Sequence, residues 1–309
     1  MKKNESSDCT TLECAVVDFL LSRQLANLSP RTIEWYEEKL GTLLDGLGKI
    51  PLSQLTIQVY RERVAARAKQ VKPTTVNHHI RAFKAFVNWL IEEGDYSVNI
   101  DPRKIKQMAI EKRNPPALTD AQIVALLKQP NRETWIGLRD HCLLSLLLDT
   151  GIRIGEALTA EMDGLDECQG TLRVIGKGNK QRVVALSLPM RKIMRKWCRV
   201  RAQLCGRLKW HTPVLFVSRM GEAMKYRIVS RNIKRYGQMA GIHGVRVSAH
   251  TFRSTFATRF CQDGGSIVHL QIILGHTTLE MSRRYAAVTD EDAFEASRCH
   301  SPLVATRTR

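Results

Sequence analysis

The chain has 309 residues, and its 48 Lys and Arg residues outnumber its 30 Asp and Glu residues, which gives a formal net charge of +18. This length suits two domains that each bury a core, and the positive charge is typical of proteins that bind nucleic acid. The longest apolar clusters, such as residues 143–148, are too short to span a membrane, and the polar N-terminus lacks the apolar segment of a signal peptide. We therefore expect a cytoplasmic protein associated with the nucleoid and without a membrane partner.

The pattern of cysteines argues against a metalloprotein and against a disulfide scaffold. The eight cysteines include no Cys-x-x-Cys pair and no compact His/Cys spacing. We therefore predict no zinc or other metal site, no cofactor, and free thiols in a reducing compartment.

The first hundred residues have the pattern of a helical domain. Ser29 followed by Pro30 is typical of a helix N-cap and first helical position, and a second helix is predicted after Thr56. A third helix is predicted after Pro73, where apolar residues recur at helical spacing, namely Val76, Ile80, Phe83, Val87 and Leu90. These segments predict a compact helical domain over residues 1–100.

Basic residues gather in two stretches of this part of the chain. Residues 61–84 hold seven Lys and Arg residues against Glu62 alone, and some of them fall outside the apolar stripe of their helix. Residues 101–116 are polar and basic and end in Asn-Pro-Pro, which predicts an interdomain linker. The candidate DNA-binding residues in the two stretches are Arg81, Lys84, Arg103, Lys104 and Lys106.

A second domain with a C-terminal tail is predicted over residues 117–309. Thr119 and Gln122 form a capping box that starts a helix. Two β-rich runs, 172–175 and 183–186, flank the turn sequence Gly-Lys-Gly-Asn-Lys, which predicts a hairpin. The remaining pattern is helical, so the predicted fold class is mainly α with a small antiparallel β-sheet.

The second domain also carries a surplus of positive charge. Basic residues run without any acid over residues 191–209 and again over residues 225–259. We expect a positive surface on each domain, as in a protein that closes around a duplex and contacts phosphates from both sides.

Five residues of the second domain carry side chains that suit attack on one phosphodiester: Arg153, His250, Arg253, His276 and Tyr285. A phosphodiester is anionic, so its attack requires positive charge around its oxygens, and two arginines supply this charge as planar forks. Imidazoles donate hydrogen bonds or move protons near neutral pH. A tyrosine hydroxyl becomes a nucleophile when nearby cations or a base favour the loss of its proton.

The order and spacing of these residues resemble the tyrosine recombinase (phage integrase) family. The family pattern is an arginine, a His-x-x-Arg pair, a Leu-Gly-His and a downstream nucleophilic tyrosine, and it is matched here at residues 150–156, 250–253, 274–276 and 285. The resemblance implies an N-terminal helical core-binding (SAM-like) domain. It also implies a C-terminal mixed α/β catalytic domain of the DNA breaking-rejoining type.

The resemblance adds two residues to the predicted site. Lys177 occupies the place of the family's β-hairpin lysine, which acts as a general acid, and Lys180 is a near alternative. Glu156 corresponds to an acid that supports the active site in the family. The predicted catalytic set is therefore Arg153, Lys177, His250, Arg253, His276 and the nucleophile Tyr285, with Glu156 in support.

The resemblance implies a site-specific DNA recombinase or integrase that cuts and rejoins strands without metal, through a 3′-phosphotyrosyl intermediate and a Holliday junction. Such enzymes act on double-stranded DNA as homotetramers or together with a related recombinase. Two alternatives stay open: an inactive DNA-binding protein of the same fold, and an enzyme similar to a type IB topoisomerase or telomere resolvase. The short segment before the first predicted helix leaves no room for an arm-binding domain. We therefore expect a two-domain, Xer-like enzyme or the recombinase of a mobile element.

Overall fold

The computed structural model describes residues 11–93, 96, 98–110 and 115–285, apart from the side chain of Lys177. The chain divides into two compact units, Met1–Lys112 and Arg113–Arg309. None of the helices in the described residues is both long and apolar enough to cross a membrane.

Four α-helices build the described part of the first unit, and the structure confirms the three that were predicted. The Ser29 side chain accepts a hydrogen bond from the backbone N–H of Thr32, and Thr56 does the same for Val59. These caps satisfy N–H groups that have no partner within the helix, so they define where α2 and α3 begin. The helices are α1 (Leu12–Leu25), α2 (Pro30–Leu43), α3 (Ile57–Ala68) and α4 (Pro73–Glu93), with short 3-10 turns η2 (Leu52–Gln54) and η3 (Pro102–Lys104).

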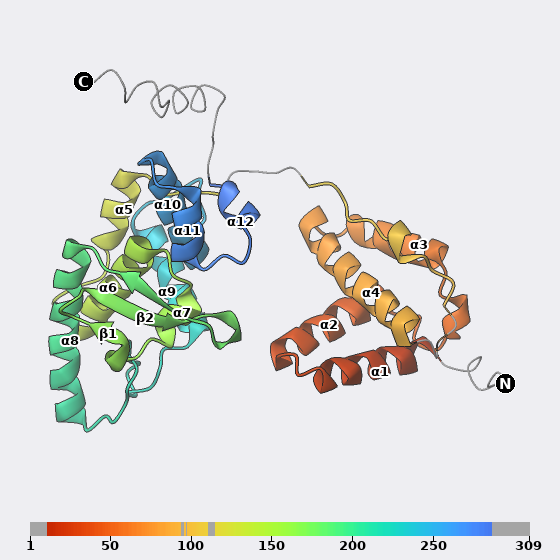
Figure 1. Ribbon diagram of the computed structural model, residues 1–309, viewed down its shortest axis with the longest axis horizontal. Helices are drawn as coiled ribbons and strands as arrows, with labels where there is room; N and C mark the ends of the chain where they lie inside the picture. Colours follow the sequence, from red (N-terminus) through yellow and green to blue (C-terminus); the bar gives the residue numbers. More distant parts are fainter. Residues whose placement is uncertain (1–10, 94–95, 97, 111–114, 286–309) are drawn as a thin grey trace, which may run out of the picture. The chain divides into compact units, whose positions relative to one another are not determined.

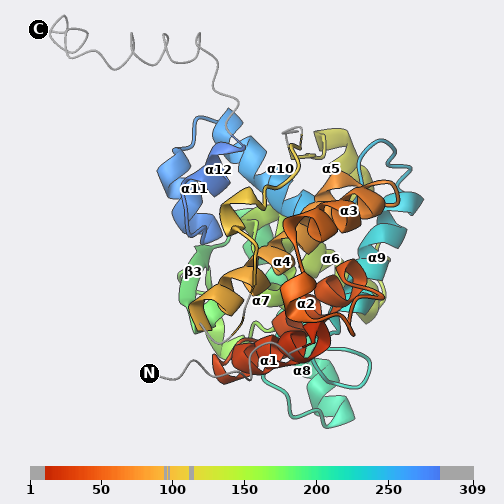
Figure 2. The ribbon, with the colours of Figure 1, turned by 90° about the vertical axis from the view of Figure 1, so that its right-hand side faces the viewer.

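Helix α4 forms the centre of the first unit and packs against α1, α2 and α3 (Figures 1 and 2). Phe83 and Phe86 of its apolar stripe are completely buried. Tyr60 of α3 stacks on Phe83 with ring centroids 4.6 Å apart, and Phe19 of α1 meets Phe86 edge to face at 5.5 Å. Such pairs stabilise beyond the burial of their area, so α4 joins the other helices into one core.

The segment after α4 also packs on the first unit. Ile105 is buried in the same core. The Asn77 side amide donates to the Met108 carbonyl at 2.9 Å and accepts from the Met108 N–H at 2.8 Å. Residues 101–108 of the segment that the sequence assigns to a linker therefore extend the first unit along α4.

Helix α6 (Trp135–Thr150) is the buried centre of the second unit and packs against α8 (Leu188–Leu208) and α10 (Ala249–Gln262) (Figure 1). The predicted capping box is confirmed: Thr119 accepts from the N–H of Gln122, whose side chain accepts from the N–H of Thr119. The remaining helices are α5 (Asp120–Leu127), α7 (Ile154–Leu158), α9 (Tyr226–Met239), α11 (Ile267–Leu274) and α12 (Glu280–Arg283).

A three-stranded antiparallel sheet in the order β1-β2-β3 completes the second unit. The predicted hairpin is confirmed as β2 (Thr171–Ile175) and β3 (Gln181–Ala185), with the 3-10 turn η5 (Lys177–Asn179) at its tip. The strand β1 (Leu165–Asp166) was not predicted, because two residues are too short to show an alternating pattern. The predicted fold class, mainly helical with a small antiparallel sheet, is confirmed.

Candidate active site

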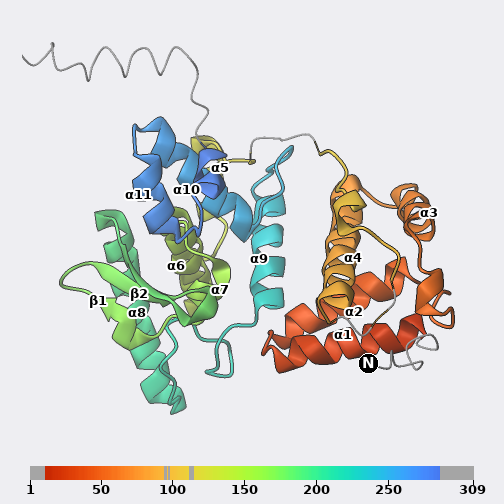
Figure 3. The ribbon, with the colours of Figure 1, turned by 45° about the vertical axis from the view of Figure 1, so that its right-hand side comes forward.

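The structure brings the five predicted motif residues together around one cavity of about 300 Å³. Arg153 precedes α7, His250 and Arg253 lie on α10, His276 follows the end of α11, and Tyr285 follows α12. Figure 1 shows α10, α11 and α12 close together at one end of the unit, and Figure 3 shows α10 and α11 there from another side. Residues that are far apart in the sequence therefore face one space.

Arg253 is buried at the cavity and held by two backbone carbonyls. Its Nη1 donates to the Gly151 carbonyl at 2.8 Å, and its Nη2 donates to the Leu274 carbonyl at 2.7 Å. A guanidinium has five N–H donors, so three are left without a partner among the described residues. Burial, and then the charge of Arg153, lower the pKa of Arg253 to about 10. The guanidinium is still charged at neutral pH, and an anion in the cavity would stabilise it.

Two glycines at helix ends help to present the backbone to Arg253. Gly151 ends α6 and Gly275 ends α11, with φ angles of 61° and 62°. This left-handed conformation favours glycine because a side chain would clash with the backbone. In the Leu-Gly-His motif, Gly275 is therefore an ordinary helix end, and it also directs the chain so that His276 enters the cavity.

Glu156 is buried beside Arg153 and orients it. The Glu156 carboxylate accepts from the backbone N–H of Arg153 at 2.8 Å and from its Nη1 at 3.0 Å. Nη2 of Arg153 also donates to the Gly275 carbonyl at 3.4 Å. Burial raises the pKa of Glu156, but the hydrogen bonds from Arg182 and Arg153 and the charge of Arg182 outweigh it and leave this pKa below its ordinary value. The carboxylate is therefore ionised at neutral pH and can hold a cation in place.

Arg182 on β3 is a site residue that sequence analysis missed. Its Nη1 and Nη2 donate to the two carboxylate oxygens of Glu156 at 2.9 and 2.8 Å, and its Nε donates to the Ile273 carbonyl at 3.1 Å. Residues two apart in a strand point to the same face, and Val184 is buried. An arginine on the inward face of an alternating strand is the signal that could have found it.

His276 is buried and is oriented by a serine. Its Nδ1 shares a hydrogen bond of 2.8 Å with Oγ of Ser282, which is completely buried. The other ring nitrogen, Nε2, has no partner among the described residues. Burial, followed by the charges of Arg253 and Arg153, lowers the pKa of His276 to about 4. The imidazole is therefore neutral at pH 7. Ser282 was also missed, since a serine in a polar segment carries no signal.

His250 lies in the first turn of α10 and lines the same cavity. Partial burial, followed by the charges of Arg284 and Arg253, lowers its pKa. The imidazoles of His250 and His276 are therefore both neutral at pH 7, and each can donate a hydrogen bond through its N–H; the pKa of about 4 makes His276 a weak base.

Tyr285 is the last residue that the structure describes, and it is only 7% exposed. Its ring packs with Leu270 and Leu274 and lies nearly parallel to the ring of His276, with centroids 6.4 Å apart. The Arg284 guanidinium lies over the ring at 5.8 Å from its centroid. Apolar contacts therefore hold the phenol ring at a cavity that is rich in cations.

The predicted general acids lie at the tip of the β2–β3 hairpin. Lys177 begins the turn η5, and its side chain lies outside the described part of the structure. Lys180 ends the turn and is exposed, and its carbonyl accepts from the N–H of Gly176 at 2.8 Å. Arg182, two residues further, connects the base of this tip to Glu156.

The predicted DNA-binding residues lie close together on the first unit, because η3 packs beside α4. Asn77, which binds the segment after η3, is one helical turn from Arg81. Arg81, Lys104 and Lys106 are exposed, Lys84 is half-buried, and Arg103 is exposed but pairs with Asp101 at 3.0 Å.

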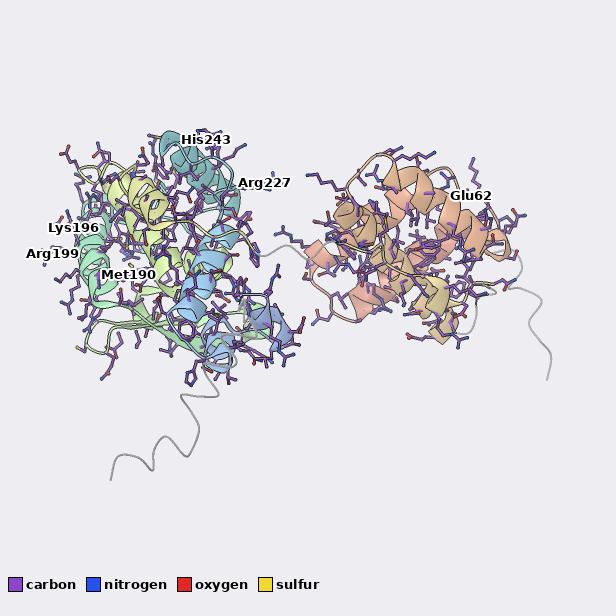
Figure 4. All side chains as sticks on the ribbon, turned by 90° about the horizontal axis from the view of Figure 1, so that it is seen from above. Glu62, Met190, Lys196, Arg199, Arg227 and His243 are labelled. Atoms are coloured by element: carbon purple, nitrogen blue, oxygen red, sulfur yellow. The ribbon has the colours of Figure 1, made fainter. Side chains whose placement is uncertain are left out.

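The first basic run of the second unit lies on α8, and the second begins with α9 and continues into α10. The helix α9 carries Arg227, and its first residue, Tyr226, lines the cavity. The helix α8 carries Lys196 and Arg199, which point away from the core (Figure 4). Since α6 packs between α8 and α10, the run on α9 adjoins the cavity and the run on α8 does not (Figure 1).

Comparison with known proteins identifies the family of this chain. Residues 116–292, more than half of the chain, match the model of the phage integrase family. The chain is 30% identical to tyrosine recombinase XerD of Haemophilus influenzae over 289 residues, which cover 90% of this chain and 94% of that protein. It is 32% identical to tyrosine recombinase XerD of Ralstonia nicotianae over 283 residues, which cover 89% of each.

Solved structures show the same fold. The chain is similar to the XerH site-specific recombinase bound to palindromic difH substrate, with a TM-score of 0.72, 20% identity and coverage of 94% of this chain and 85% of that one. For the Tn1549 transposon integrase in complex with transposon right end DNA, the TM-score is 0.74, the identity 19% and the coverage 94% and 100%. The fold, the family match and these relatives agree: the chain belongs to the phage integrase family and is a tyrosine recombinase.

Proposed function

We propose that this recombinase cuts and rejoins DNA at a specific site through Tyr285, with Arg153 and Arg253 binding the phosphate that is attacked. The observation that carries this proposal is the single cavity that both arginines, both histidines and the tyrosine line. A side chain that attacks phosphorus and the groups that stabilise the resulting charge must reach the same atom, and a shared cavity allows this.

The cavity has the charge that a phosphodiester requires. Arg153 and Arg253 are each held from one side, by Glu156 and by two carbonyls, so N–H groups remain for a ligand. Arg284 adds a third guanidinium, and no acidic residue is among the described residues that line the space. Burial, followed by the charges of neighbouring arginines, lowers the pKa values of Arg253 and His276, so positive charge in this space is poorly compensated. An anionic phosphate supplies the missing negative charge, so binding and charge stabilisation go together.

In the proposed cleavage step, the Tyr285 oxygen attacks phosphorus and gives up its proton to a neutral imidazole or to water. The new bond joins the tyrosine oxygen to phosphorus, and the bond between phosphorus and the 5′ oxygen of deoxyribose breaks. The leaving 5′ oxygen takes a proton from a general acid, for which we propose Lys177, with Lys180 as the alternative on the same turn. Rejoining reverses each transfer, because the phosphotyrosyl ester retains the energy of the original bond.

We further propose that residues 1–100 form a core-binding domain that grips duplex DNA, together with the first part of the segment 101–116, which packs on α4. Its basic surface around α4 and η3 carries Arg81, Lys104 and Lys106. In the catalytic unit, residues 117–309, the basic helix α9 begins at the cavity, which its first residue, Tyr226, lines. Contacts of this kind bind phosphates without reading the sequence. Replacing the three exposed lysines and arginines by alanine should weaken binding and flatten its dependence on salt concentration.

The assembly that we propose is a homotetramer on DNA, or a mixed tetramer in which a related recombinase supplies some of the protomers. We expect it to form in the cytoplasm, at the nucleoid. A structural neighbour of the same fold is the lambda integrase tetramer bound to a Holliday junction, with a TM-score of 0.71 and 17% identity. Sedimentation of the purified protein with a synthetic Holliday junction tests this proposal. Cooperative binding of four protomers to each junction supports it, and independent binding of single protomers, with partly filled junctions at intermediate concentrations, contradicts it.

The decisive experiment traps the covalent intermediate. The protein is incubated with a library of nicked duplexes of random sequence and denatured, and the DNA that remains attached is sequenced. Wild-type protein should yield adducts that share one sequence. The variant Tyr285→Phe should yield none. Tyr226→Phe is the matched control, because it removes another phenol hydroxyl from the lining of the same cavity and should leave the adduct.

Two further results define the reaction. Arg153→Ala and Arg253→Ala should still bind the recovered site but fail to form the adduct, and normal cleavage by either variant contradicts the phosphate-binding role. A supercoiled plasmid without the recovered site should stay supercoiled. Its relaxation would instead indicate a topoisomerase, and an absence of adducts with every sequence would indicate an inactive DNA-binding protein.

A further inference from the structure

Arg182 connects three structural elements that surround the active site. From β3 it donates two hydrogen bonds to Glu156 of α7, at 2.9 and 2.8 Å, and one to the Ile273 carbonyl in α11, at 3.1 Å. Glu156 in turn holds the backbone and the guanidinium of Arg153. The hairpin, Arg153 and the end of α11 therefore depend on the same side chain for their relative positions.

The position of Arg182 within the hairpin is important. It pairs with Val174, and one further pair, between Ile175 and Gln181, separates it from the tip. Among the side chains from 175 to 182 that the structure describes, that of Arg182 alone is hydrogen-bonded to a residue outside the hairpin. The tip that carries Lys177 therefore has its polar anchor two residues behind it on β3.

The contact with α11 is close enough to transmit a displacement. A Cβ atom added at Gly275 would lie 3.2 Å from Nη1 of Arg182, so the guanidinium lies directly against the glycine that precedes His276. The planar guanidinium of Arg182 binds both carboxylate oxygens of Glu156 and the Ile273 carbonyl at once. A lysine ammonium is a single charged point, so it cannot reach all three oxygens in the same geometry.

We propose that Arg182 is a positioning residue. It holds the tip of the hairpin, and with it Lys177, at a fixed position relative to Arg153 and His276. This inference depends on the proposed role of Lys177 as the acid that protonates the leaving 5′ oxygen. Without the anchor the tip moves, and proton transfer to the leaving group fails first, because Arg153 keeps its two hydrogen bonds to Glu156.

A pair of substrates tests this proposal. Both are nicked duplexes with the sequence recovered from wild-type adducts, and in one of them sulfur replaces the bridging 5′ oxygen at the cleaved bond. A thiolate leaves without a proton because thiols are far stronger acids than alcohols. Arg182→Ala should cleave the ordinary duplex about 100-fold more slowly than wild type, the scale expected for a displaced catalytic group. It should regain most of that rate on the sulfur duplex.

Matched variants distinguish positioning from a general loss of structure. Arg182→Lys keeps a positive charge beside Glu156 but loses the fork, so a folded protein with the same selective defect is expected. Arg173→Ala removes an arginine from the neighbouring strand that pairs with Asp163 at 2.9 Å on the exposed face, and it should cleave both duplexes at the wild-type rate. Lys177→Ala provides the reference for full rescue by sulfur, and Arg153→Ala the reference for none.

The outcomes separate this inference from the function on which it rests. If Arg182→Ala cleaves the ordinary duplex normally, or is equally slow on both duplexes while Lys177→Ala is rescued, Arg182 does not position the acid. If Lys177→Ala is not rescued, the general acid has been assigned wrongly. If the wild-type protein forms no adduct at all, the proposed function itself is wrong.

Discussion

Replacing Glu156 with glutamine should destabilise the catalytic unit by a predictable amount. The Glu156 side chain is 3% exposed and accepts four hydrogen bonds, two from Arg153 and two from Arg182, at 2.8–3.0 Å. Glutamine keeps one acceptor oxygen and turns an NH₂ group toward donors that are already there. The two guanidiniums then lose the carboxylate that they share.

The size of the loss follows from burial. Removing one partner of a buried ion pair costs about 3–5 kcal/mol. The Arg153 side chain is 39% exposed, so water compensates part of its charge, and we expect a loss at the lower end, about 3 kcal/mol. In a domain of this size 1 kcal/mol lowers Tm by about 2–4 °C, so the transition of the catalytic unit should fall by about 6–12 °C. Differential scanning calorimetry measures this shift.

A matched substitution and a pH series test the reasoning. Glu167→Gln makes the same change in an exposed pair, 3.6 Å from Arg195, where about 0–1 kcal/mol is expected. The pKa of Glu156 in the folded protein lies below its ordinary value of 4.5, so its stabilisation is complete above that pH and is lost as the pH falls below it. The difference between wild type and Glu156→Gln should therefore shrink in acid. A loss no larger than that of Glu167→Gln, or one that is constant down to low pH, would refute the argument.

Three further predictions follow from the site. Ser282→Ala removes the partner of His276 Nδ1 and should slow adduct formation about tenfold, the value of one hydrogen bond. Ser254→Ala removes a buried hydroxyl that has no partner among the described residues and should not slow it; equal slowing by both would contradict the role of Ser282. The pKa of His276 is lowered from 6.5 to about 4, so between these pH values the unfolded chain binds a proton at this residue and the folded protein does not. The free energy of unfolding should therefore fall between pH 6.5 and pH 4, and His276→Gln should remove about 3 kcal/mol of that fall in urea titrations; an unchanged pH dependence would show that His276 is not the group responsible. At Gly151, φ is 61° and a Cβ would lie 2.6 Å from the Phe256 ring, so Gly151→Ala should cost about 2 kcal/mol or more, and a variant that melts with the wild type would count against the clash.

Much of the secondary structure could be predicted because its signals are local. A cap such as Ser29 or Thr119 bonds to an N–H only three residues away, so the residues that define a helix start are neighbours in the sequence. The hairpin could be predicted for the same reason, since alternation and turn residues lie within one short segment. The pairing of β1 with β2 could not, because a two-residue strand forms only when a partner is already in place.

The sequence by itself determined the class of protein, because the order of its motifs matches one family, and it predicted five side chains that the structure gathers around one cavity. Only the tertiary structure decided what holds them. Arg182 lies 26 positions from Glu156, and Arg253 lies 102 positions from Gly151, so no local pattern connects these partners. The physical reason is that a buried guanidinium donates its N–H groups to whichever carbonyls and carboxylates the packing brings near. Packing is a property of the whole fold, so a local stretch of sequence does not specify these partners.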